Sequence, residues 1–219
     1  MITVWCMNTN HHAPDSEVHI LKRMVDRHLS IDHEFICISD NDIDGIDTVK
    51  PINDLPGWWL KTTLFAPTVS RKRNLWLDLD VTITQNIDAL VEPLNDYYDI
   101  RTILNWADSG HGGIQSSVMY WEGNSAQTIH DKFNHADAYW PPRTNEFWDN
   151  GQVKWGDQEW CTYLRDTNQI KVEYFDPAHV VSYKYHCLKG LPDDSLIQIF
   201  HGKPDPDEVR DEWVKAARS

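Results

Sequence analysis

The segment LWLDLD at residues 75–80 joins a run of large apolar side chains to two aspartates, Asp78 and Asp80. The apolar run is typical of a buried strand, which we predict over residues 74–79. Two carboxylates at the end of such a strand are costly to bury unless a cation or another partner compensates them. Because ligands bind beyond the carboxyl ends of strands in open α/β sheets, the segment predicts a ligand site there.

Two aspartates separated by one residue also suit a divalent cation. Carboxylate oxygens are the ligands that hard divalent cations prefer, and a cation held in this way can also bridge phosphates. The same spacing occurs at three other places, Asp40/Asp42, Asp42/Asp44 and Asp205/Asp207. Only the pair within residues 75–80 directly follows an apolar run, Leu75 to Leu77, and places carboxylates where a strand should be buried, so only this pair is predicted to bind a metal.

The segments on either side alternate between strand and helix patterns, which predicts an α/β fold with a mostly parallel central sheet flanked by helices. Strands are predicted at 2–6, 34–39, 74–79, 99–104, 114–121, near 172 and 180, and at 196–200. Helices are predicted at 18–29, 58–66, 88–94, 125–137, 157–166 and 206–217, with a long functional loop at 139–156. No repeat, linker or break in composition interrupts this order, so we expect one domain over 1–219.

The composition narrows the class of protein. With 219 residues, 41% of them hydrophobic, the chain can bury a sizeable core. Its net charge of −14 argues against a nucleic-acid partner, whose phosphates it would repel. No apolar run is long enough to predict a membrane span, and no cleavable signal opens the sequence, so the cytoplasm is the expected compartment, or a host cytoplasm if the chain is viral.

Three further segments place polar residues where a ligand site would form. His201 and Lys203 follow the last predicted strand and offer an imidazole for a metal and an ammonium for a phosphate. Asp157 opens a predicted helix, where it can be an N-cap or first-turn residue, or contact sugar hydroxyls. Two glycines at 112–113 precede the strand at 114–121, which allows close approach of a ligand or only a bulge.

In their order along the chain, these segments resemble the metal-dependent GT-A glycosyltransferases. The similarity is to the glycogenin-like and bacterial galactosyltransferase group and its short phage and bacterial relatives. Six segments carry it: WWLK at 58–61, LWLDLD at 75–80, IQSSVM at 114–119, GDQ at 156–158, VSYK at 181–184 and FHGKP at 200–204. The resemblance implies one Rossmann-like GT-A domain, with the nucleotide-binding part at about 1–105 and the donor-sugar and acceptor part at about 106–219.

The resemblance also implies roles for single residues. Mn²⁺ or Mg²⁺ would be held by Asp78, Asp80 and His201. The nucleotide and its diphosphate would contact Cys6, Met7, Asn8, Asp40, Lys61, Asp78 and Lys203. The donor sugar would contact Gln115, Ser116 and Asp157, and the reaction would use Asp157 and Gln158. Two departures bear on these roles: relatives commonly have Asn where Gln115 stands, and acidic residues follow Pro204 where relatives are more basic.

The implied activity is transfer of a hexose-type sugar from a nucleoside-diphosphate donor, expected to be UDP-linked, to a hydroxyl of an unidentified glycan, lipid or protein acceptor. Retention of configuration is expected, with Asp157 as a general base for inversion left open. Two alternatives remain. Residues 78–82 also fit the DxDxT motif of haloacid-dehalogenase-type phosphatases, although two predicted strands precede it, whereas that fold normally opens with this strand. The chain could also be an inactive sugar-nucleotide-binding module.

Overall fold

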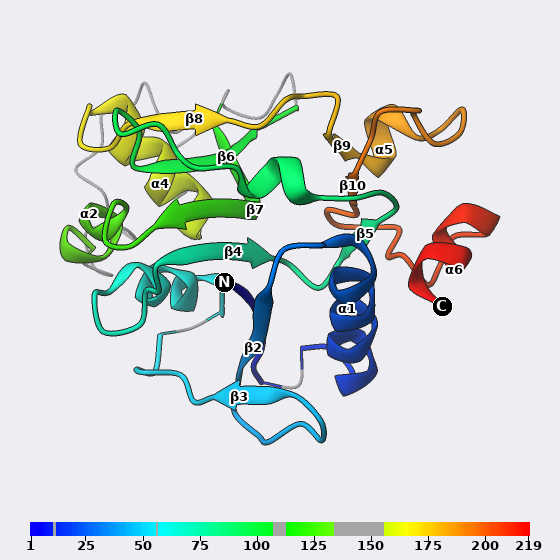
Figure 1. Cartoon of the computed structure of the whole chain (residues 1–219), viewed down its shortest axis with the longest axis horizontal. Helices are drawn as coiled ribbons and strands as arrows, with labels where there is room; N and C mark the ends of the chain where they lie inside the picture. The colour runs from blue at the N-terminus through cyan, green and yellow to red at the C-terminus, as the bar shows by residue number, and fades with distance from the viewer. Residues whose placement is uncertain (11, 56, 107–112, 134–155) are drawn as a thin grey trace, which may run out of the picture.

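The computed structural model describes residues 1–10, 12–55, 57–106, 113–133 and 156–219. Seven strands form the central sheet in the order β3-β2-β1-β4-β7-β6-β8 (Figure 1). Their bounds are β1 Ile2–Asn8, β2 His33–Ser39, β3 Asp47–Val49, β4 Arg73–Leu77, β6 Ile100–Leu104, β7 Ile114–Glu122 and β8 Val172–Tyr174. A second sheet, in the order β5-β10-β9, consists of β5 Val81–Ile83, β9 Val180–Ser182 and β10 Ile197–Ile199.

The strand directions confirm the predicted mostly parallel sheet. β3, β2, β1 and β4 are parallel neighbours, and β6 is parallel to β8. β7 is antiparallel to both β4 and β6, so it is the reversed strand of this sheet. The start of β7 therefore lies at the edge where β1, β2 and β4 end.

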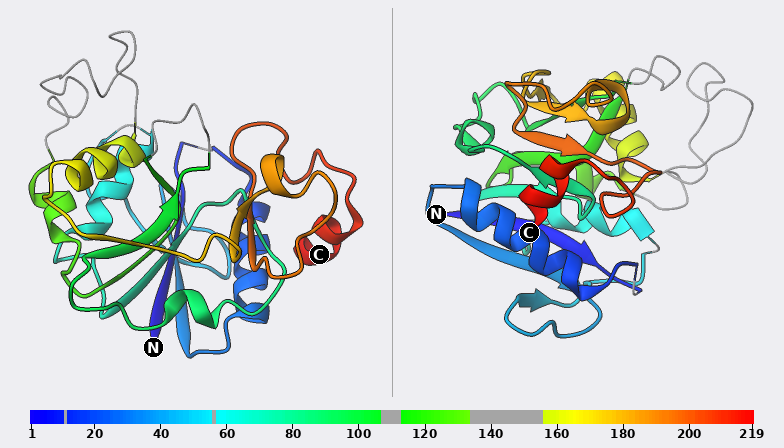
Figure 2. Two further views of the ribbon diagram at one scale, coloured as in Figure 1. Left: turned by 90° about the horizontal axis from the view of Figure 1, so that it is seen from above. Right: turned by 90° about the vertical axis from the view of Figure 1, so that its right-hand side faces the viewer.

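Helices cover both faces of the central sheet (Figure 2). α1 (Asp15–His28) lies on one face, beside α6 (Glu212–Arg218). On the other face, η1 (Gly57–Phe65) packs against α2 (Gln127–Asp131) and α4 (Asp157–Asp166). Two short helices, η2 (Asp88–Val91) and α5 (Tyr183–His186), complete the described elements. No helix in these ranges combines the length and apolarity needed to cross a bilayer.

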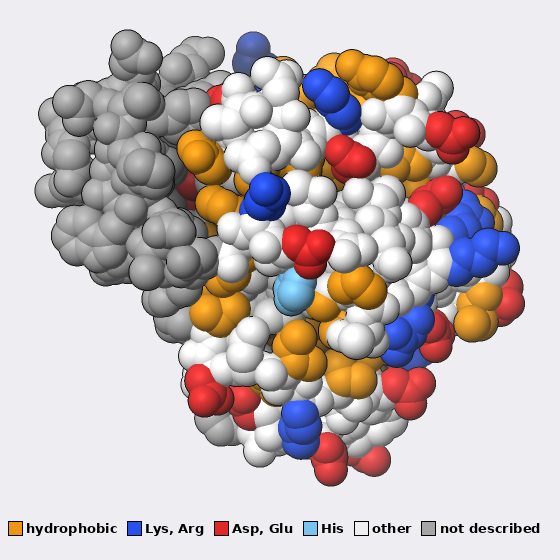
Figure 3. All heavy atoms as spheres, turned by 90° about the vertical axis from the view of Figure 1, so that its left-hand side faces the viewer, with side chains coloured by type: hydrophobic (Ala, Val, Ile, Leu, Met, Phe, Trp, Pro, Cys, Tyr) orange, Lys and Arg blue, Asp and Glu red, His pale blue; other side chains and the backbone are white. Residues whose placement is uncertain are grey.

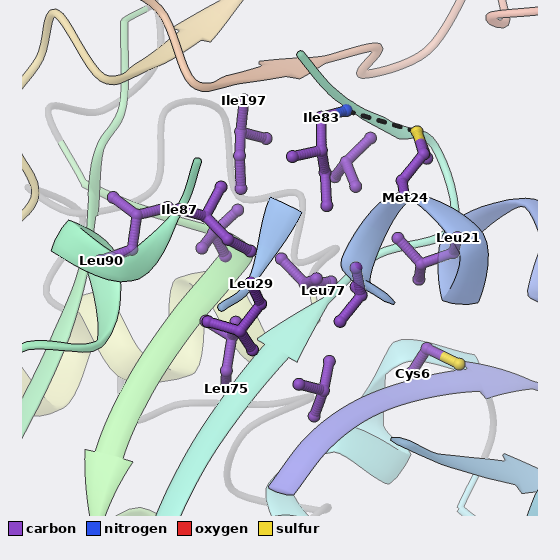
Figure 4. Packing of buried hydrophobic residues seen from close by; sticks show 14 of the residues in the cluster. Cys6, Leu21, Met24, Leu29, Leu75, Leu77, Ile83, Ile87, Leu90 and Ile197 are labelled. Atoms are coloured by element: carbon purple, nitrogen blue, oxygen red, sulfur yellow. Dashed lines mark hydrogen bonds between the residues drawn. The ribbon is translucent and has the colours of Figure 1, made fainter. Parts of the chain in front are cut away.

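The alternation of side chains along β1 and β4 divides the core into two clusters. Cys6, Leu75 and Leu77 point to the α1 side, where they join Leu21 and other apolar residues (Figure 4). Trp5 and Trp76 point to the opposite side and pack with the buried residues of η1, α2 and α4. Successive residues of a strand face opposite sides of the sheet, so each strand contributes to both clusters.

Several predicted boundaries are wrong. The last helix begins at Glu212 instead of 206, and the helix predicted over 125–137 ends at Asp131 within the described residues. The sequence does not predict β3 or β5, because β3 is a short polar segment and β5 directly follows Asp78 and Asp80, the acidic pair. Residues 134–137, and the loop predicted at 139–156 except for Gly156, lie outside the described part of the chain.

Candidate functional site

The acidic pair lies where the chain leaves β4 and passes between β7 and β10. The Asp78 N–H donates a hydrogen bond of 2.9 Å to the Ser117 carbonyl oxygen. The Asp80 carbonyl oxygen accepts a hydrogen bond of 3.1 Å from the Phe200 N–H. Asp78 therefore lies beside the start of β7, and Asp80 lies beside the end of β10, one residue before His201.

The two carboxylates of the pair differ in how they are compensated. Asp78 Oδ1 accepts a hydrogen bond of 2.9 Å from Trp76 Nε1 and lies 2.8 Å from the Lys61 ammonium. Asp80 Oδ1 is buried and has no hydrogen-bond partner. Burial, and then the neighbouring charge of Asp78, raise the pKa of Asp80 to about 7. Lys61 opposes this shift, but among the described residues it forms its ion pair with Asp78 and not with Asp80, so Asp80 is the less compensated carboxylate of the two.

Lys61 is a buried cation at the centre of the site. η1 delivers its side chain, which is only 2% exposed, to Asp78 and to Asp157 Oδ2, which lies 3.6 Å from the ammonium. Ser116 offers its hydroxyl at 3.4 Å. Burial alone would lower the pKa of Lys61, but the carboxylates of Asp157 and Asp78 outweigh it and raise the pKa above its usual value. Lys61 therefore stays charged.

Asp157 is the first residue of α4, which confirms the first-turn position and excludes the N-cap position. Gly156 is the N-cap, and its N–H donates to Glu159 Oε2 at 3.2 Å. The Asp157 side chain is buried, and its Oδ2 has no hydrogen-bond partner. Burial raises the pKa of Asp157, while Lys61 and a hydrogen bond with the Ser116 side chain oppose that shift. The carboxylate thus belongs to the Lys61 cluster.

The start of β7 and the first turn of α4 carry the other three predicted polar residues, Gln115, Ser116 and Gln158. The Gln158 Oε1 atom accepts a hydrogen bond of 3.4 Å from the Ser116 N–H, which joins α4 to β7. Gln115 folds back along its own strand, where its amide bonds the hydroxyl and the N–H of Ser117 at 2.5 and 3.0 Å. Gln158 is partly exposed, whereas Gln115 and Ser116 are buried.

His201 lies in an aromatic surrounding next to the acidic pair. Its Nε2 atom is 2.7 Å from the Ser182 hydroxyl, and its ring stacks on Trp106 at a centroid distance of 5.8 Å. The Tyr185 ring lies on it at a tilt, with centroids 5.6 Å apart. Burial, and the nearby charges of Lys184 and His186, lower the pKa of His201. The imidazole is therefore fixed in place and favours its neutral form, the form that ligates metals.

Lys203 is an exposed cation that pairs with two carboxylates. Its side chain is 70% exposed, and its ammonium lies 2.5 Å from Asp205 Oδ2 and 2.9 Å from Glu208 Oε1. The hydrogen bonds that its ammonium donates to these two carboxylates raise the pKa of Lys203. Acidic residues that follow Pro204, where relatives are more basic, therefore form ion pairs with Lys203, the cation expected to contact the diphosphate.

The ends of β1 and β2 lie side by side, with Asn8 opposite Ser39. The Asn8 amide bonds the backbone of Ala13 at 3.0 and 3.1 Å, and Asp40 Oδ2 accepts from the Asn10 N–H at 2.5 Å. Met7 is partly exposed and packs against the η1 side of the core. The Cys6 thiol does not reach this surface, because it is buried in the α1-side cluster, and burial raises its pKa.

Sequence reasoning missed two side chains that hold the site residues. The sequence indicates Trp76 only as part of the apolar run of a buried strand. Its position two residues before Asp78 nevertheless places both side chains on the same face of the sheet. Ser182 lay within a matching segment, but no role was assigned to its hydroxyl. Their hydrogen bonds to Asp78 and His201 become visible only once the strands are paired.

The residues present fit a divalent cation by their chemistry. In the described ranges, no three His, Cys, Asp or Glu side chains are already grouped as a metal site. Among the described residues, Asp80 Oδ1 is nevertheless an oxygen ligand without a hydrogen-bond partner. Asp78 precedes it by two residues, and His201 directly follows Phe200, whose N–H bonds the Asp80 backbone. Such sites use few protein ligands and leave positions for water and substrate phosphates.

A separate hollow of about 780 Å³ lies between η1 and α2 and contains none of the predicted site residues in its described lining. It is lined by Asn53, Asp54, Leu55, Thr62, Thr63, His130, Asp131 and Phe133. Figure 3 views the side of the molecule that carries these elements, and its acidic and basic side chains are interspersed.

No protein-family model and no curated protein sequence matches the chain. Solved glycosyltransferase structures do resemble it. GlyE of Streptococcus pneumoniae TIGR4 has a TM-score of 0.67 at 15% identity, over 94% of this chain and 56% of GlyE. The galactosyltransferase LgtC, in complex with donor and acceptor sugar analogs, has a TM-score of 0.62 at 10% identity, over 100% of this chain and 97% of LgtC. The chain has the GT-A glycosyltransferase fold.

Mouse xyloside xylosyltransferase 1 shares the GT-A fold with the chain, at a TM-score of 0.63 and 12% identity, over 93% of this chain and 98% of that structure. The chain spans just over half the length of GlyE but nearly the whole of the other two structures. The GT-A fold confirms the predicted fold class. It argues against the phosphatase alternative, because β1, β2 and β3 precede the acidic pair along the chain.

Proposed function

We propose that the protein is a metal-dependent glycosyltransferase that moves a hexose-type sugar from a UDP-linked donor to an acceptor hydroxyl. One observation carries the proposal: on a GT-A fold, the buried Asp80 Oδ1 has no hydrogen-bond partner among the described residues, while Asp78 Oδ1 beside it is held by Trp76 and Lys61. An unpaired buried carboxylate oxygen is costly, and a divalent cation would remove that cost. Its place at the end of β4 is where α/β sheets bind ligands.

Asp78, Asp80 and His201 would hold Mn²⁺ or Mg²⁺. When bound, the cation supplies positive charge against the negative charge that develops on the departing nucleoside diphosphate. Lys203 would add a second positive charge after its ammonium leaves Asp205 and Glu208. The ends of β1 and β2, with Met7, Asn8 and Asp40, would receive the nucleotide base; the buried Cys6 would contribute only its backbone.

The donor sugar would lie against the start of β7 and the start of α4. Its hydroxyls would donate to Asp157 and contact Gln158, Gln115 and Ser116. The acceptor hydroxyl attacks the anomeric carbon, the bond from that carbon to the phosphate oxygen breaks, and the acceptor proton passes to the departing phosphate oxygen. Lys61 would keep Asp157 ionised beside the sugar, where a negative charge stabilises a cationic anomeric centre.

This assignment corresponds to retention of configuration. In the inverting alternative, Asp157 itself takes the acceptor proton. The two differ in the product: proton NMR of the anomeric signal would show the donor's configuration in the first case and the opposite one in the second. A finding of inversion would reject our assignment for Asp157 while leaving the glycosyltransferase proposal intact.

The proposal is tested by screening nucleotide sugars for thermal stabilisation and for release of the nucleotide, each with Mn²⁺ and with EDTA. Ligand that binds the folded state raises the melting temperature by mass action. We expect one UDP-sugar to stabilise the protein and to be turned over only with metal. Stabilisation without turnover toward any acceptor would favour an inactive binding module, and hydrolysis of simple phosphate esters instead would favour the phosphatase.

A further inference from the structure

The hydrogen bond from Trp76 to Asp78 links the buried sheet to the proposed metal site. Trp76 is only 1% exposed and is fixed on both sides, opposite Trp5 on β1 and Met119 on β7. Its indole N–H donates to Asp78 Oδ1 at 2.9 Å. Because a buried N–H without an acceptor is costly, this bond fixes the orientation of both side chains.

Two other buried tryptophans of the sheet show that a carboxylate partner is not required for packing. Trp5 Nε1 donates to the side-chain oxygen of Asn74 at 3.1 Å, and Trp121 Nε1 donates to the Ser70 hydroxyl at 2.8 Å. Both partners are neutral and lie toward the start of β4, away from the acidic pair at its end. Trp76, in contrast, uses an ionised group of the proposed metal site.

Lys61 contacts both Asp78 Oδ1 and the ring of Trp76. Its ammonium lies 2.8 Å from Asp78 Oδ1 and 5.1 Å from the Trp76 ring centroid, a distance that permits a cation–π interaction. Trp76 therefore contacts both members of the ion pair, one through its N–H and the other through its face. Both donors occupy Oδ1, and neither occupies Oδ2.

We propose that Trp76 is a positioning residue for the metal site. By holding Oδ1 together with Lys61, it turns the carboxylate so that Asp78 Oδ2 is presented to the cation and the diphosphate. Donors behind a metal ligand orient it, and their loss commonly weakens metal binding about 10- to 100-fold. This inference rests on the proposed function, because it assumes that Asp78 binds a cation.

The test compares Trp76→Phe with Trp121→Phe in the full chain. Each change removes one buried indole N–H and keeps an aromatic ring, but only the first touches Asp78. The affinity for Mn²⁺ in the presence of UDP is measured from the electron paramagnetic resonance signal of free Mn²⁺. We expect Trp76→Phe to weaken it about tenfold or more, and Trp121→Phe to leave it unchanged at a similar loss of melting temperature.

A double-mutant cycle and NMR spectra of the wild-type protein complete the test. In an Asp78→Asn background, Trp76→Phe should cause no further loss of Mn²⁺ affinity, because the ligand it positions is gone. In ¹H–¹⁵N spectra of the wild type, Mg²⁺ with UDP should shift the Trp76 indole signal and leave that of Trp121 in place. This readout remains available if Trp76→Phe does not fold.

Two results would overturn the inference in distinguishable ways. If the wild type binds Mn²⁺ and Trp76→Phe leaves that affinity unchanged, or Trp121→Phe weakens it equally, the positioning role is rejected and the proposed function stands. Absence of any Mn²⁺ binding by the wild type with UDP, and of any Mg²⁺ shift at Trp76, would reject both together.

Discussion

The Phe200 N–H donates a hydrogen bond of 3.1 Å to the carbonyl oxygen of Asp80, directly after the pairing of Ile199 with Val81. This bond continues the β5–β10 ladder by one residue and brings two distant parts of the chain together. It sets the start of the segment FHGKP beside the acidic pair. The register of the second sheet, and not any local sequence feature, therefore brings the backbone segment that leads into His201 to Asp80.

The first prediction concerns pH and the metal-free protein. The folded-state pKa of Asp80 is about 7, above the ordinary value of 3.8, so the folded state binds this proton more tightly than the unfolded state. Asp80 therefore makes the free energy of unfolding fall as pH rises from about 4 to about 7. Chemical unfolding across this range with EDTA should show that decline in the wild type and a smaller one in Asp80→Asn.

The same pKa predicts how Mn²⁺ binding with UDP depends on pH. Below pH 7, the metal must displace the Asp80 proton, so apparent affinity should fall by about tenfold per pH unit toward pH 5 and level off above 7. Titration calorimetry at several pH values would measure this. A flat profile between pH 5 and 7 would contradict the assignment of Asp80 as the uncompensated ligand.

The third prediction concerns the buried Lys61 cluster. Lys61→Met should lower the free energy of unfolding at pH 7 by about 3–5 kcal/mol, because it leaves Asp78 and Asp157 without their cation. Burial raises the pKa of Asp157, so the loss should be smaller at pH 5, where that carboxylate takes up a proton more readily. The double variant Lys61→Met/Asp157→Asn should recover part of the stability. Equal stability of single and double variants would refute the pairing.

The fourth prediction separates a structural role of Asp157 from a role at the donor sugar. Asp157→Asn keeps the size of the side chain and leaves Gly156 and the Lys61–Asp78 pair in place, but it removes one carboxylate partner of the buried Lys61, so the melting temperature should fall. Turnover should fall roughly a hundredfold or more, which corresponds to a few kcal/mol of transition-state stabilisation. UDP affinity should barely move. A variant that melts early but turns over normally would show that Asp157 serves only the fold.

The fifth prediction concerns the acidic residues that hold Lys203. Replacing Asp205 with Asn and Glu208 with Gln frees the ammonium for a phosphate. Since the ammonium no longer has to leave two carboxylates in order to reach a phosphate, and exposed ion pairs are weak, UDP affinity should rise by roughly twofold to tenfold. Adding Lys203→Met to this variant should cancel the gain. A gain that survives Lys203→Met would mean that the carboxylates act on the nucleotide directly.

Much of the fold follows from local pattern. The apolar run before Asp78 predicted β4, and the helical spacing after Pro14 predicted α1, because each element buries one periodic set of side chains. β3 and β5 escaped prediction, since three-residue strands carry too little periodicity and owe their existence to the neighbours with which they pair. α6 begins later than predicted, because the acidic segment after Pro204 forms turns instead of helix.

The candidate site was less accessible to sequence reasoning than the fold. Order along the chain indicated which segments meet, and Asp78, Asp157 and Lys61 do form one cluster. It did not reveal that Asp157 and Lys61 are buried, that Lys203 is paired to carboxylates, or that the Cys6 thiol faces the core. Burial and pairing depend on which side of each strand a residue occupies and on segments that are remote in sequence.

The most direct test of a metal-dependent transferase is the release of UDP from the stabilising donor by wild type and Asp80→Asn, each with Mn²⁺ and with EDTA. We expect EDTA to abolish wild-type turnover and Mn²⁺ to restore it. With Mn²⁺, Asp80→Asn should be at least about a hundredfold slower than the wild type. Its metal-free melting temperature should be no lower than that of the wild type, because the change removes an uncompensated charge. Wild-type turnover that persists in EDTA, or near-normal turnover by Asp80→Asn, would contradict the proposed metal dependence.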